Sequence, residues 1–270
     1  MVQMRKDDKN KQWLVRREEV EVSQYLREER FCFPEKPKAA KSFGDIQENG
    51  SEFIREWWKR NKAIAENNKE EWQKIVEQAC KGILKEGKLL NQEFEAQLLA
   101  AQLLTVKDKS VEEIYCSCIR LYTAESFLYK LVNSTLRNED WSKVDTLGAY
   151  CCLLNRHLWK SRNKQELILY RGCTLTTELF EEYKEAIGKW IKWLGFSSTS
   201  KSRQQAEQFG NTLFIIHISR SYLASWQSDI SSFSHYPFEQ EVLLMAGHSF
   251  YVKQVERDPE SQKYLIYLAL

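Results

Sequence analysis

Two carboxylates lie two residues apart where an apolar segment begins near the C-terminal end of the chain. Glu239 follows Pro237 on a turn, and Glu241 begins the apolar run that continues to Met245. Because side chains alternate with a period of two in an extended chain, we expect both carboxylates to point toward one cleft. Close negative charges raise each other's pKa unless a cation meets them. The pair therefore indicates a site for a positively charged group, with a solvated strand edge as the plainer alternative.

A cation and a glycine end an apolar run earlier in the chain. Arg171 follows the buried-strand pattern of residues 167–170, and Gly172 comes next. A buried arginine is costly unless an anion meets it, and a phosphate or a carboxylate matches its planar fork of donors. The missing side chain of Gly172 leaves room for a ligand to approach the backbone closely. This pair predicts an anion-binding position at the end of a strand.

Three hydroxyl side chains, those of Ser198, Thr199 and Ser200, follow a second extended run. They can bind sugar hydroxyls, although such a run by itself is more often a turn and a helix cap. Together, a cation for a diphosphate, hydroxyls for a ribose and a carboxylate for a developing positive charge suit cleavage of the N-glycosidic bond of NAD. A dehydrogenase would need a G-x-G-x-x-G turn, and the sequence has none.

The elements that must position these residues change character along the chain. Residues 1–50 form a mixed-charge arm rich in proline and glycine, which is typical of a mobile or loosely docked segment, and a helix over 18–29 stays open. Apolar residues then recur at helical spacing to about residue 159, and short strands follow Lys164. The sequence therefore predicts a helical half followed by a strand half.

Each half has recognisable elements. The pattern predicts helices that begin at Ser51, that carry the apolar stripe of Trp72, Ile75, Val76 and Ala79, that carry Phe94, Leu98 and Ala101, and that cover residues 114–136. It predicts strands over residues 167–170, 189–193, 212–218, 241–245, 250–255 and 264–270, with a short helix capped by Ser202. The tryptophans and tyrosines of the helical half are predicted to lie in its core rather than on a base-stacking surface.

Composition limits the class of protein. With 270 residues, 43% hydrophobic, and a formal net charge of +2, the chain is expected to fold without a strong attraction for nucleic acid or anionic membranes. It shows no signal peptide and no apolar run long enough to span a bilayer, so we predict a cytoplasmic protein, or a secreted one if a leader was removed. The seven cysteines lack C-x-x-C spacing, which predicts free, mostly buried thiols and no metal site.

Three segments in order resemble the R-S-E signature of the arginine-specific mono-ADP-ribosyltransferases, also called NAD(P)(+)-protein-arginine ADP-ribosyltransferases. They are LYRG at 169–172, FSSTS at 196–200 and PFEQEVL at 237–243. The resemblance covers roughly residues 95–270. It implies a catalytic domain over residues 96–270. Composition and periodicity then leave the arm over 1–50 and a helical segment of unknown role over 51–95. The implied fold is α+β, a helical N-terminal half packed beside two facing, mostly antiparallel sheets with an NAD cleft between them.

The resemblance also implies a role for each matching residue. Arg171, with Gly172 beside it, would hold the diphosphate of NAD. Ser198 would bind the nicotinamide-side ribose and steady Glu241, with Thr199 and Ser200 as supporting residues of the NAD site. Glu241 would stabilise the positive charge that develops as nicotinamide leaves.

Glu239 would, by the same resemblance, receive the guanidinium of an arginine in a protein acceptor and help to remove its proton. Relatives of the diphtheria-toxin-like and polymer-forming branch carry histidine where this chain has Arg171. The implied reaction is transfer of ADP-ribose from NAD or NADP without a metal. An NAD glycohydrolase and an inactive NAD-binding module remain as alternatives.

Overall fold

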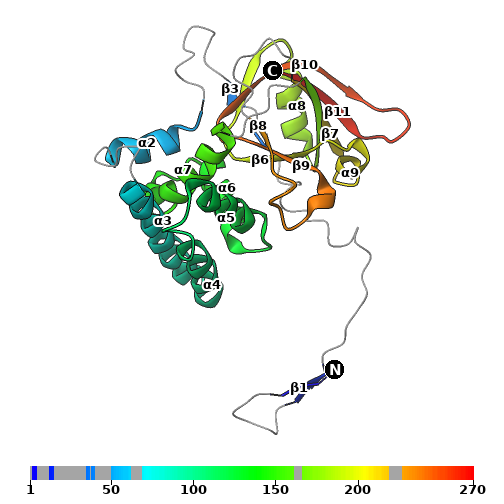
Figure 1. The fold of residues 1–270 in the computed structure, drawn as a ribbon. Coiled ribbons are helices and arrows are strands. Elements are labelled where there is room, and N and C mark those ends of the chain that lie inside the picture. Colours follow the sequence, from blue (N-terminus) through cyan, green and yellow to red (C-terminus); the bar gives the residue numbers. More distant parts are fainter. Residues whose placement is uncertain are drawn as a thin grey trace.

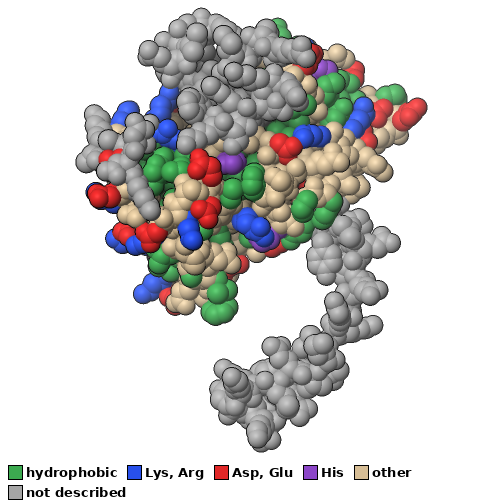
Figure 2. Space-filling view, viewed as in Figure 1, with side chains coloured by type: hydrophobic (Ala, Val, Ile, Leu, Met, Phe, Trp, Pro, Cys, Tyr) green, Lys and Arg blue, Asp and Glu red, His purple; other side chains and the backbone are tan. Residues whose placement is uncertain are grey.

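The structure is a computed structural model that describes residues 2–4, 12–14, 35–36, 38–39, 50–61, 69–160, 166–218 and 227–270. Within these ranges a helical half lies beside a strand half, in the order that the sequence predicts (Figure 1). The helix left open over residues 18–29 lies outside the described residues. The face of the molecule seen in Figure 2 carries acidic and basic side chains intermixed.

The helical half begins at the predicted residue. Ser51 is the N-cap of the first described helix, and its hydroxyl accepts a hydrogen bond from the backbone N–H of Ile54 at 3.4 Å. The helices are α2 (Glu52–Arg60), α3 (Lys69–Leu89), α4 (Glu93–Leu104), α5 (Val111–Thr123), α6 (Phe127–Arg137) and α7 (Val144–Lys160), with the 3₁₀ turn η3 (Trp141–Lys143) before α7. None of the described helices is long and apolar enough to cross a membrane.

Helix α3 is the centre of this half, because α4 packs on one side of it and α7 on another. The predicted stripe of Trp72, Ile75, Val76 and Ala79 is buried, as expected from its spacing. Gly82 lets α7 approach closely: a Cβ there would lie 1.7 Å from the carbonyl oxygen of Thr146. Close helix packing at a small residue therefore sets the distance between α3 and α7.

The third predicted helix exists as α4, but the face chosen for its core is wrong. Phe94 is 75% exposed and Leu98 50% exposed, whereas Ala96, Ala100 and Leu103 are buried against the other helices. Apolar residues surround α4 on all sides, so periodicity alone could not tell its inner face from its outer face. Hydrophobic side chains consequently lie on the surface over α4 (Figure 2).

The aromatic residues of the helical half lie mainly in the core, as predicted. Trp57, Tyr115, Tyr122, Tyr129 and Tyr150 are each at most 2% exposed, although Trp141 is 42% exposed. The same apolar cluster continues into the strand half through Phe196, Leu243, Met245 and Ala246. One hydrophobic core therefore spans the contact between the two halves. The six cysteines among the described residues are free thiols, and all but Cys116 are buried.

The strand half contains β4 (Leu167–Cys173), β5 (Trp190–Trp193), β6 (Ser197–Ser200), β7 (Thr212–Ile218), β8 (Gln227–Asp229), β9 (Glu241–Leu244), β10 (His248–Arg257) and β11 (Tyr264–Ala269). Between them lie the helices α8 (Thr177–Glu185) and α9 (Arg203–Glu207) and the 3₁₀ turn η4 (Pro237–Glu239). Ser202 caps α9 as predicted, since its hydroxyl accepts a hydrogen bond from the N–H of Gln205 at 3.3 Å. Two further short strands, β1 (Val2–Met4) and β2 (Gln12–Leu14), pair with each other.

Among the described strands, β3 (Lys38–Ala39) to β11 form one sheet in the order β3-β5-β10-β11-β7-β4-β6-β9-β8. The pairs are antiparallel except β7 with β11, which confirms the mostly antiparallel α+β fold. The expected division into two separate sheets is not confirmed. The pair Tyr170–Ser200 joins β4 to β6 and so makes the sheet continuous, and it is the one residue pair that links those strands.

The sheet bends strongly around its own core. Three strands separate β5 from β4 in the sheet order, which in a flat sheet would place them about 19 Å apart at the usual strand spacing. Yet the guanidinium carbon of Arg171 on β4 lies 6.0 Å from the ring centre of Trp193 on β5. Apolar residues from strands on both sides of the Tyr170–Ser200 pair fill the space that this bend encloses, among them Phe214, Val242 and Phe250.

The predicted domain boundaries remain predictions. The boundary between residues 95 and 96 falls inside α4, and α3 and α4 share one apolar core with α5–α7. The arm, predicted to be mobile or loosely docked, places Glu35 at 2% exposure inside the strand half, and β3 pairs with β5.

We predict that Gly82→Ala lowers the free energy of unfolding by about 1–3 kcal/mol, the usual cost of overpacking, although alanine is the better helix former by about 1 kcal/mol. The added Cβ would meet backbone atoms of Thr146, which cannot swing aside as a side chain can. Chemical denaturation measures the change, with Lys81→Ala on the exposed face of α3 as the control. Equal or greater stability of the Gly82 variant would contradict this account of the α3–α7 contact.

Candidate active site

The three signature segments meet where β4, β6 and β9 lie side by side. In the register of β6 with β9, Ser198 faces Leu243 and Ser200 faces Glu241. Tyr170 of β4 pairs with Ser200, so the backbone of Arg171 lies next to the same point. Residues more than 25 positions apart in sequence are thus brought together by strand pairing, as the resemblance implied.

Arg171 is held at this junction by its guanidinium. The side chain is 1% exposed, and Nη1 donates a hydrogen bond to the backbone oxygen of Ser198 at 2.7 Å. The face of Trp193 lies at 6.0 Å, within the range of a cation–π contact. The predicted cation is therefore buried and oriented from two sides, but it lies inside β4, which continues to Cys173, rather than at the end of a strand as predicted.

The three hydroxyls differ in their surroundings. Thr199 Oγ1 donates to the backbone oxygen of Val242 at 2.6 Å. Ser200 Oγ donates to the backbone oxygen of Glu239 at 2.8 Å and accepts from the N–H of Ser202 at 3.0 Å. Ser198 Oγ is buried and has no hydrogen-bond partner within the part of the chain that the structure describes. The hydroxyls of Thr199 and Ser200 thus hold the backbone of Val242 and Glu239, whereas the hydroxyl of Ser198 is paired with no described residue.

The carboxylate pair lies on a tight turn rather than on extended chain. Glu239 ends the turn η4, and Gln240 has φ +47°, the left-handed region that few residues other than glycine adopt. Strand β9 then begins at Glu241. The period-two reasoning is therefore wrong for this turn, yet both carboxylates are buried, Glu239 at 2% and Glu241 at 0% exposure. The alternative of a solvated strand edge is excluded.

Gly172 has a packing reason of its own. A Cβ at this position would lie 2.0 Å from the backbone oxygen of Ala206 and 2.8 Å from the Cβ of Phe209. The room that this glycine leaves is filled by the segment of α9, which packs against β4 at that point. The predicted contact of Gly172 with a ligand stays a prediction.

Sequence reasoning missed several residues that border the site. The sequence pattern predicts Trp193 only as part of an extended run, although its ring lies against Arg171. Lys201 follows Ser200 and forms an ion pair with Asp229 across the edge of β9. Burial alone would raise the pKa of the Asp229 carboxyl, but hydrogen bonds from Lys201 and Ser231 hold it below its ordinary value. Nothing in the sequence pattern marked these contacts, because each joins separate elements.

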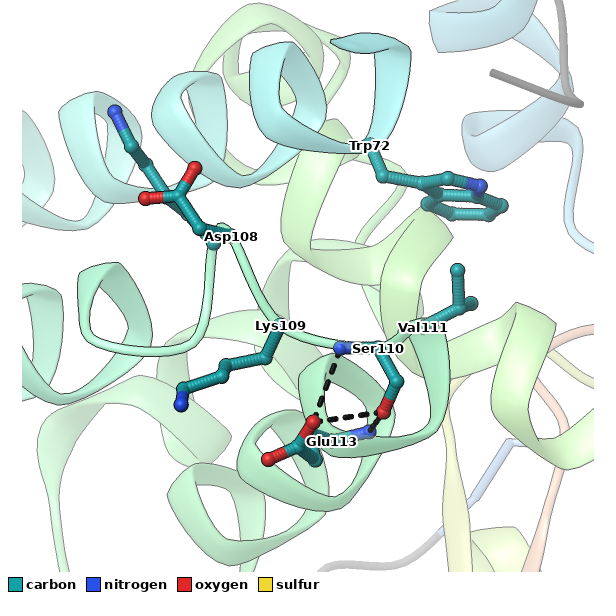
Figure 3. A pocket seen from close by; sticks show the side chains of 7 residues that line it. Trp72, Asp108, Lys109, Ser110, Val111 and Glu113 are labelled. Atoms are coloured by element: carbon teal, nitrogen blue, oxygen red, sulfur yellow. Dashed lines mark hydrogen bonds between the residues drawn. The ribbon is translucent and has the colours of Figure 1, made fainter. Parts of the chain in front are cut away.

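A hollow elsewhere in the molecule contains none of the predicted site residues. It has a volume of about 510 Å3 and is lined by Trp72 on α3 and by the segment from Lys107 to Val111 with Glu113 (Figure 3). Ser110 and Glu113 form a reciprocal capping box at its wall, which starts α5. Lys107 and Asp108 of the lining pair with Glu77 and Gln73 of α3, so the hollow is a feature of the helical half. In the described ranges no group of three or more His, Cys, Asp or Glu side chains is arranged to hold a metal ion.

Comparison with known proteins decides the family. Residues 99–269 match the model of the family described as ADP-ribosyltransferase exoenzyme. The chain belongs to the ADP-ribosyltransferase exoenzyme family. This membership confirms the predicted family and assigns residues 99–269 to an ADP-ribosyltransferase domain. The match begins close to residue 95, where the resemblance read from the sequence also begins.

The name of one relative states which amino acid accepts ADP-ribose. A Mycobacterium avium (strain 104) protein, provisionally named NAD(+)–arginine ADP-ribosyltransferase Mav, is 34% identical over 102 residues, which are 36% of this chain. The chain spans only 11% of the length of that relative.

Two solved structures share the fold. HopU1 of Pseudomonas syringae pv. tomato DC3000 aligns with a TM-score of 0.51 and 21% identity over 63% of this chain and 86% of HopU1. Exoenzyme S of Pseudomonas aeruginosa, bound to human 14-3-3 protein beta and carba-NAD, aligns with a TM-score of 0.50 and 19% identity over 72% of this chain and 88% of its own. At these identities the likeness shows the fold of an ADP-ribosyltransferase.

The different surroundings of two serines lead to a prediction about stability. Ser200→Ala should lower the free energy of unfolding by about 1–2 kcal/mol, because the Glu239 carbonyl and the Ser202 N–H would each lose a partner. Ser198→Ala should change it by less than about 0.5 kcal/mol, because no hydrogen bond within the described residues is lost. Denaturant titrations of the two variants measure the contrast. Equal losses would show that the Ser198 hydroxyl also supports the fold.

Proposed function

We propose that this chain transfers ADP-ribose from NAD to the guanidinium of an arginine in a protein acceptor and releases nicotinamide. The observation that carries the proposal is the burial of Glu239 on the turn and of Glu241 at the start of β9, at 2% and 0% exposure. Strand β9 pairs with β6, which carries Ser198, and the hydroxyl of Ser198 has no hydrogen-bond partner among the described residues. Buried carboxylates are costly unless a cation compensates them. A guanidinium acceptor and a ribose that becomes positively charged are two such cations.

The residues present fit NAD. Arg171 supplies a buried, oriented guanidinium whose planar fork of donors matches the phosphate oxygens of a diphosphate. Ser198 supplies a buried hydroxyl for a ribose hydroxyl. Both groups lie on one junction of strands, since Nη1 of Arg171 donates to the backbone of Ser198. The proposal includes NADP as a second possible donor of ADP-ribose.

Glu241 is proposed to act on the bond that breaks. As the N-glycosidic bond lengthens, the electron pair leaves with nicotinamide and positive charge develops on the ribose. Glu241 sits opposite Ser200 and two residues from Leu243, which faces Ser198, so its position is set by the β6–β9 register. A carboxylate held there by strand pairing needs no reorganisation when the charge appears, and this favours the transition state over bound substrate.

Glu239 is proposed to act on the acceptor. A guanidinium has a pKa above about 12 and is a poor nucleophile while protonated. The nucleophilic nitrogen must lose a proton as it forms the new bond to the ribose carbon, and a carboxylate can both pair with the cation and accept that proton. Ser200 holds the backbone of Glu239 at 2.8 Å, which fixes the turn that carries it. The partial relative named for arginine supports this acceptor.

Water is the competing acceptor. An NAD glycohydrolase would use Arg171, Ser198 and Glu241 but would have no guanidinium for Glu239 to bind or deprotonate. The burial of Glu239 and its hydrogen-bonded turn favour transfer, because an idle carboxylate would be cheaper in solvent. The cytoplasmic location predicted from the sequence is retained as part of the proposal.

The deciding experiment incubates the protein with labelled NAD and either agmatine or polyarginine, and separates modified acceptor from free ADP-ribose. Acceptor-dependent label supports arginine transfer. Free ADP-ribose alone, at a rate that agmatine does not change, supports the glycohydrolase. Absence of both products, with NAD still bound in calorimetry, supports the inactive module.

Glu241→Ala should lower turnover by roughly two to three orders of magnitude, the usual loss for one electrostatic stabiliser of a transition state. NAD affinity should change far less, because the positive charge on the ribose is absent in the bound substrate. Initial rates with labelled NAD and calorimetric NAD binding measure the two effects. Turnover at the unmutated rate would refute the role of Glu241.

Glu239→Gln should abolish modification of agmatine while slow NAD hydrolysis continues, since glutamine can hydrogen-bond to a guanidinium but cannot accept its proton. Glu207→Gln is the control, because Glu207 lies on α9 in an exposed pair with Arg203. Loss of transfer and hydrolysis in parallel would show that Glu239 serves bond cleavage itself. Agmatine transfer at the unmutated rate would show that Glu239 serves neither step.

A further inference from the structure

A carboxylate from the N-terminal arm lies buried inside the strand half. Glu35 is 2% exposed, although it precedes the region that matches the family model, which begins at residue 99. Its neighbour Lys36 lies at the surface and forms an ion pair with Glu182 at 3.4 Å. Burying a charged group is costly unless other groups pair with it. The contacts of Glu35 therefore indicate what it does.

The carboxylate of Glu35 lies against the connection that leads into β6. Oε1 accepts hydrogen bonds from Nη1 of Arg137 at 3.4 Å and from Oγ of Ser197 at 3.5 Å. A Cβ on Gly195 would lie 3.2 Å from Oε1, so the glycine in this connection gives the carboxylate its room. Ser197 directly precedes Ser198. The charge of Glu35 is thus shared between α6 and the first residue of the strand that carries the proposed ribose-binding hydroxyl.

The backbone of Glu35 continues the contact toward Arg171. Its carbonyl oxygen accepts a hydrogen bond from the hydroxyl of Tyr183 at 2.8 Å, and that hydroxyl accepts one from Nε1 of Trp193 at 2.9 Å. The ring of Trp193 is fully buried and lies 6.0 Å from the guanidinium carbon of Arg171. Two consecutive hydrogen bonds therefore fix the aromatic face against which the guanidinium rests.

We propose that Glu35 is a positioning residue of the NAD site. It holds the start of β6 through its carboxylate and Trp193 through its carbonyl, and so orients Ser198 and Arg171 from outside the region that matches the family. The inference rests on the proposed function in one respect, the assignment of Arg171 and Ser198 to NAD. In this proposal Glu35 acts on the reaction through neighbouring residues and does not contact the substrate.

The test compares full-length variants in two measurements. Glu35→Gln removes the charge but keeps the shape, and Tyr183→Phe removes the hydroxyl between Glu35 and Trp193 while keeping the ring. Lys36→Gln is the matched control, because it breaks an exposed ion pair on the same segment. Calorimetry measures NAD affinity, steady-state kinetics measures KM for NAD and for agmatine, and 15N spectra of labelled tryptophan report the indole N–H of Trp193, assigned by its loss in Trp193→Phe.

We expect Glu35→Gln and Tyr183→Phe each to weaken NAD binding about three- to tenfold, the scale of one lost hydrogen bond. KM for NAD should rise accordingly, while kcat and KM for agmatine change little. The Trp193 indole signal should shift in Tyr183→Phe, which loses the hydroxyl that accepts a hydrogen bond from Nε1, and stay in place in Lys36→Gln. A residue that served only stability would lower the unfolding midpoint and leave all of these readouts unchanged in the folded protein.

The outcomes separate this inference from the proposed function. Unchanged NAD affinity in both variants overturns the role of Glu35 in a parent protein that binds NAD. If the parent binds no NAD, the proposed function fails, and the indole signal of Tyr183→Phe decides whether the Tyr183 hydroxyl, which donates to the carbonyl of Glu35, holds Trp193. If Glu35→Gln does not fold, Tyr183→Phe gives the same decision, because it cuts the link beyond Glu35.

Discussion

A buried guanidinium holds together the point on which the rest of this structure depends. The strands divide into a large group that ends at β4 and a small group that begins at β6, and a single residue pair joins them. Next to that pair, Arg171 donates to the backbone of Ser198 and rests on Trp193, so one side chain contacts β6 and the bent-over end of the sheet at once. Strand pairing would normally close such a junction. Here a buried cation lies at the junction, and it is the group proposed to meet the diphosphate of NAD.

The acidic turn is the counterpart of this cation. Gln240 adopts a left-handed conformation that costs energy for a residue with a side chain, and the turn persists because the surrounding backbone determines it: Ser200 holds the carbonyl of Glu239, and the N–H of Ile230 donates to the carbonyl of Glu241. The strained residue thus separates two buried carboxylates that would point alike on a regular strand. In the proposed reaction, one of these carboxylates serves the ribose and the other serves the acceptor.

The helical half contacts the strand segment that carries the candidate site. Its apolar core includes Phe196 and Leu243, which border Ser198 and Glu241, and the side chain of Asn133 accepts a hydrogen bond from the N–H of Phe196 at 3.0 Å. Glu35 approaches the same connection from the arm. The β5–β6 segment is therefore held from three separate parts of the chain, although the site itself is formed by residues of the strand half.

The sequence by itself determined the local elements, the order of the two halves and the identity of the residues that meet at the site. Ser51 and Ser202 cap their helices as predicted, because capping depends on residues within one turn. The residue types at 171, 198, 239 and 241 sufficed for the family, because their chemistry and order are written in the chain.

Only the tertiary structure decided which faces are buried and which distant groups touch. Periodicity placed Phe94 and Leu98 in the core, and packing put Ala96 and Ala100 there instead, because α4 is apolar on every side. The contact of Trp193 with Arg171 requires the bend of the whole sheet, and the burial of Glu35 requires that it pack against the strand half, next to the pairing of β3 with β5. Such contacts depend on the sum of many weak pairings between elements, and no local pattern of residues records that sum.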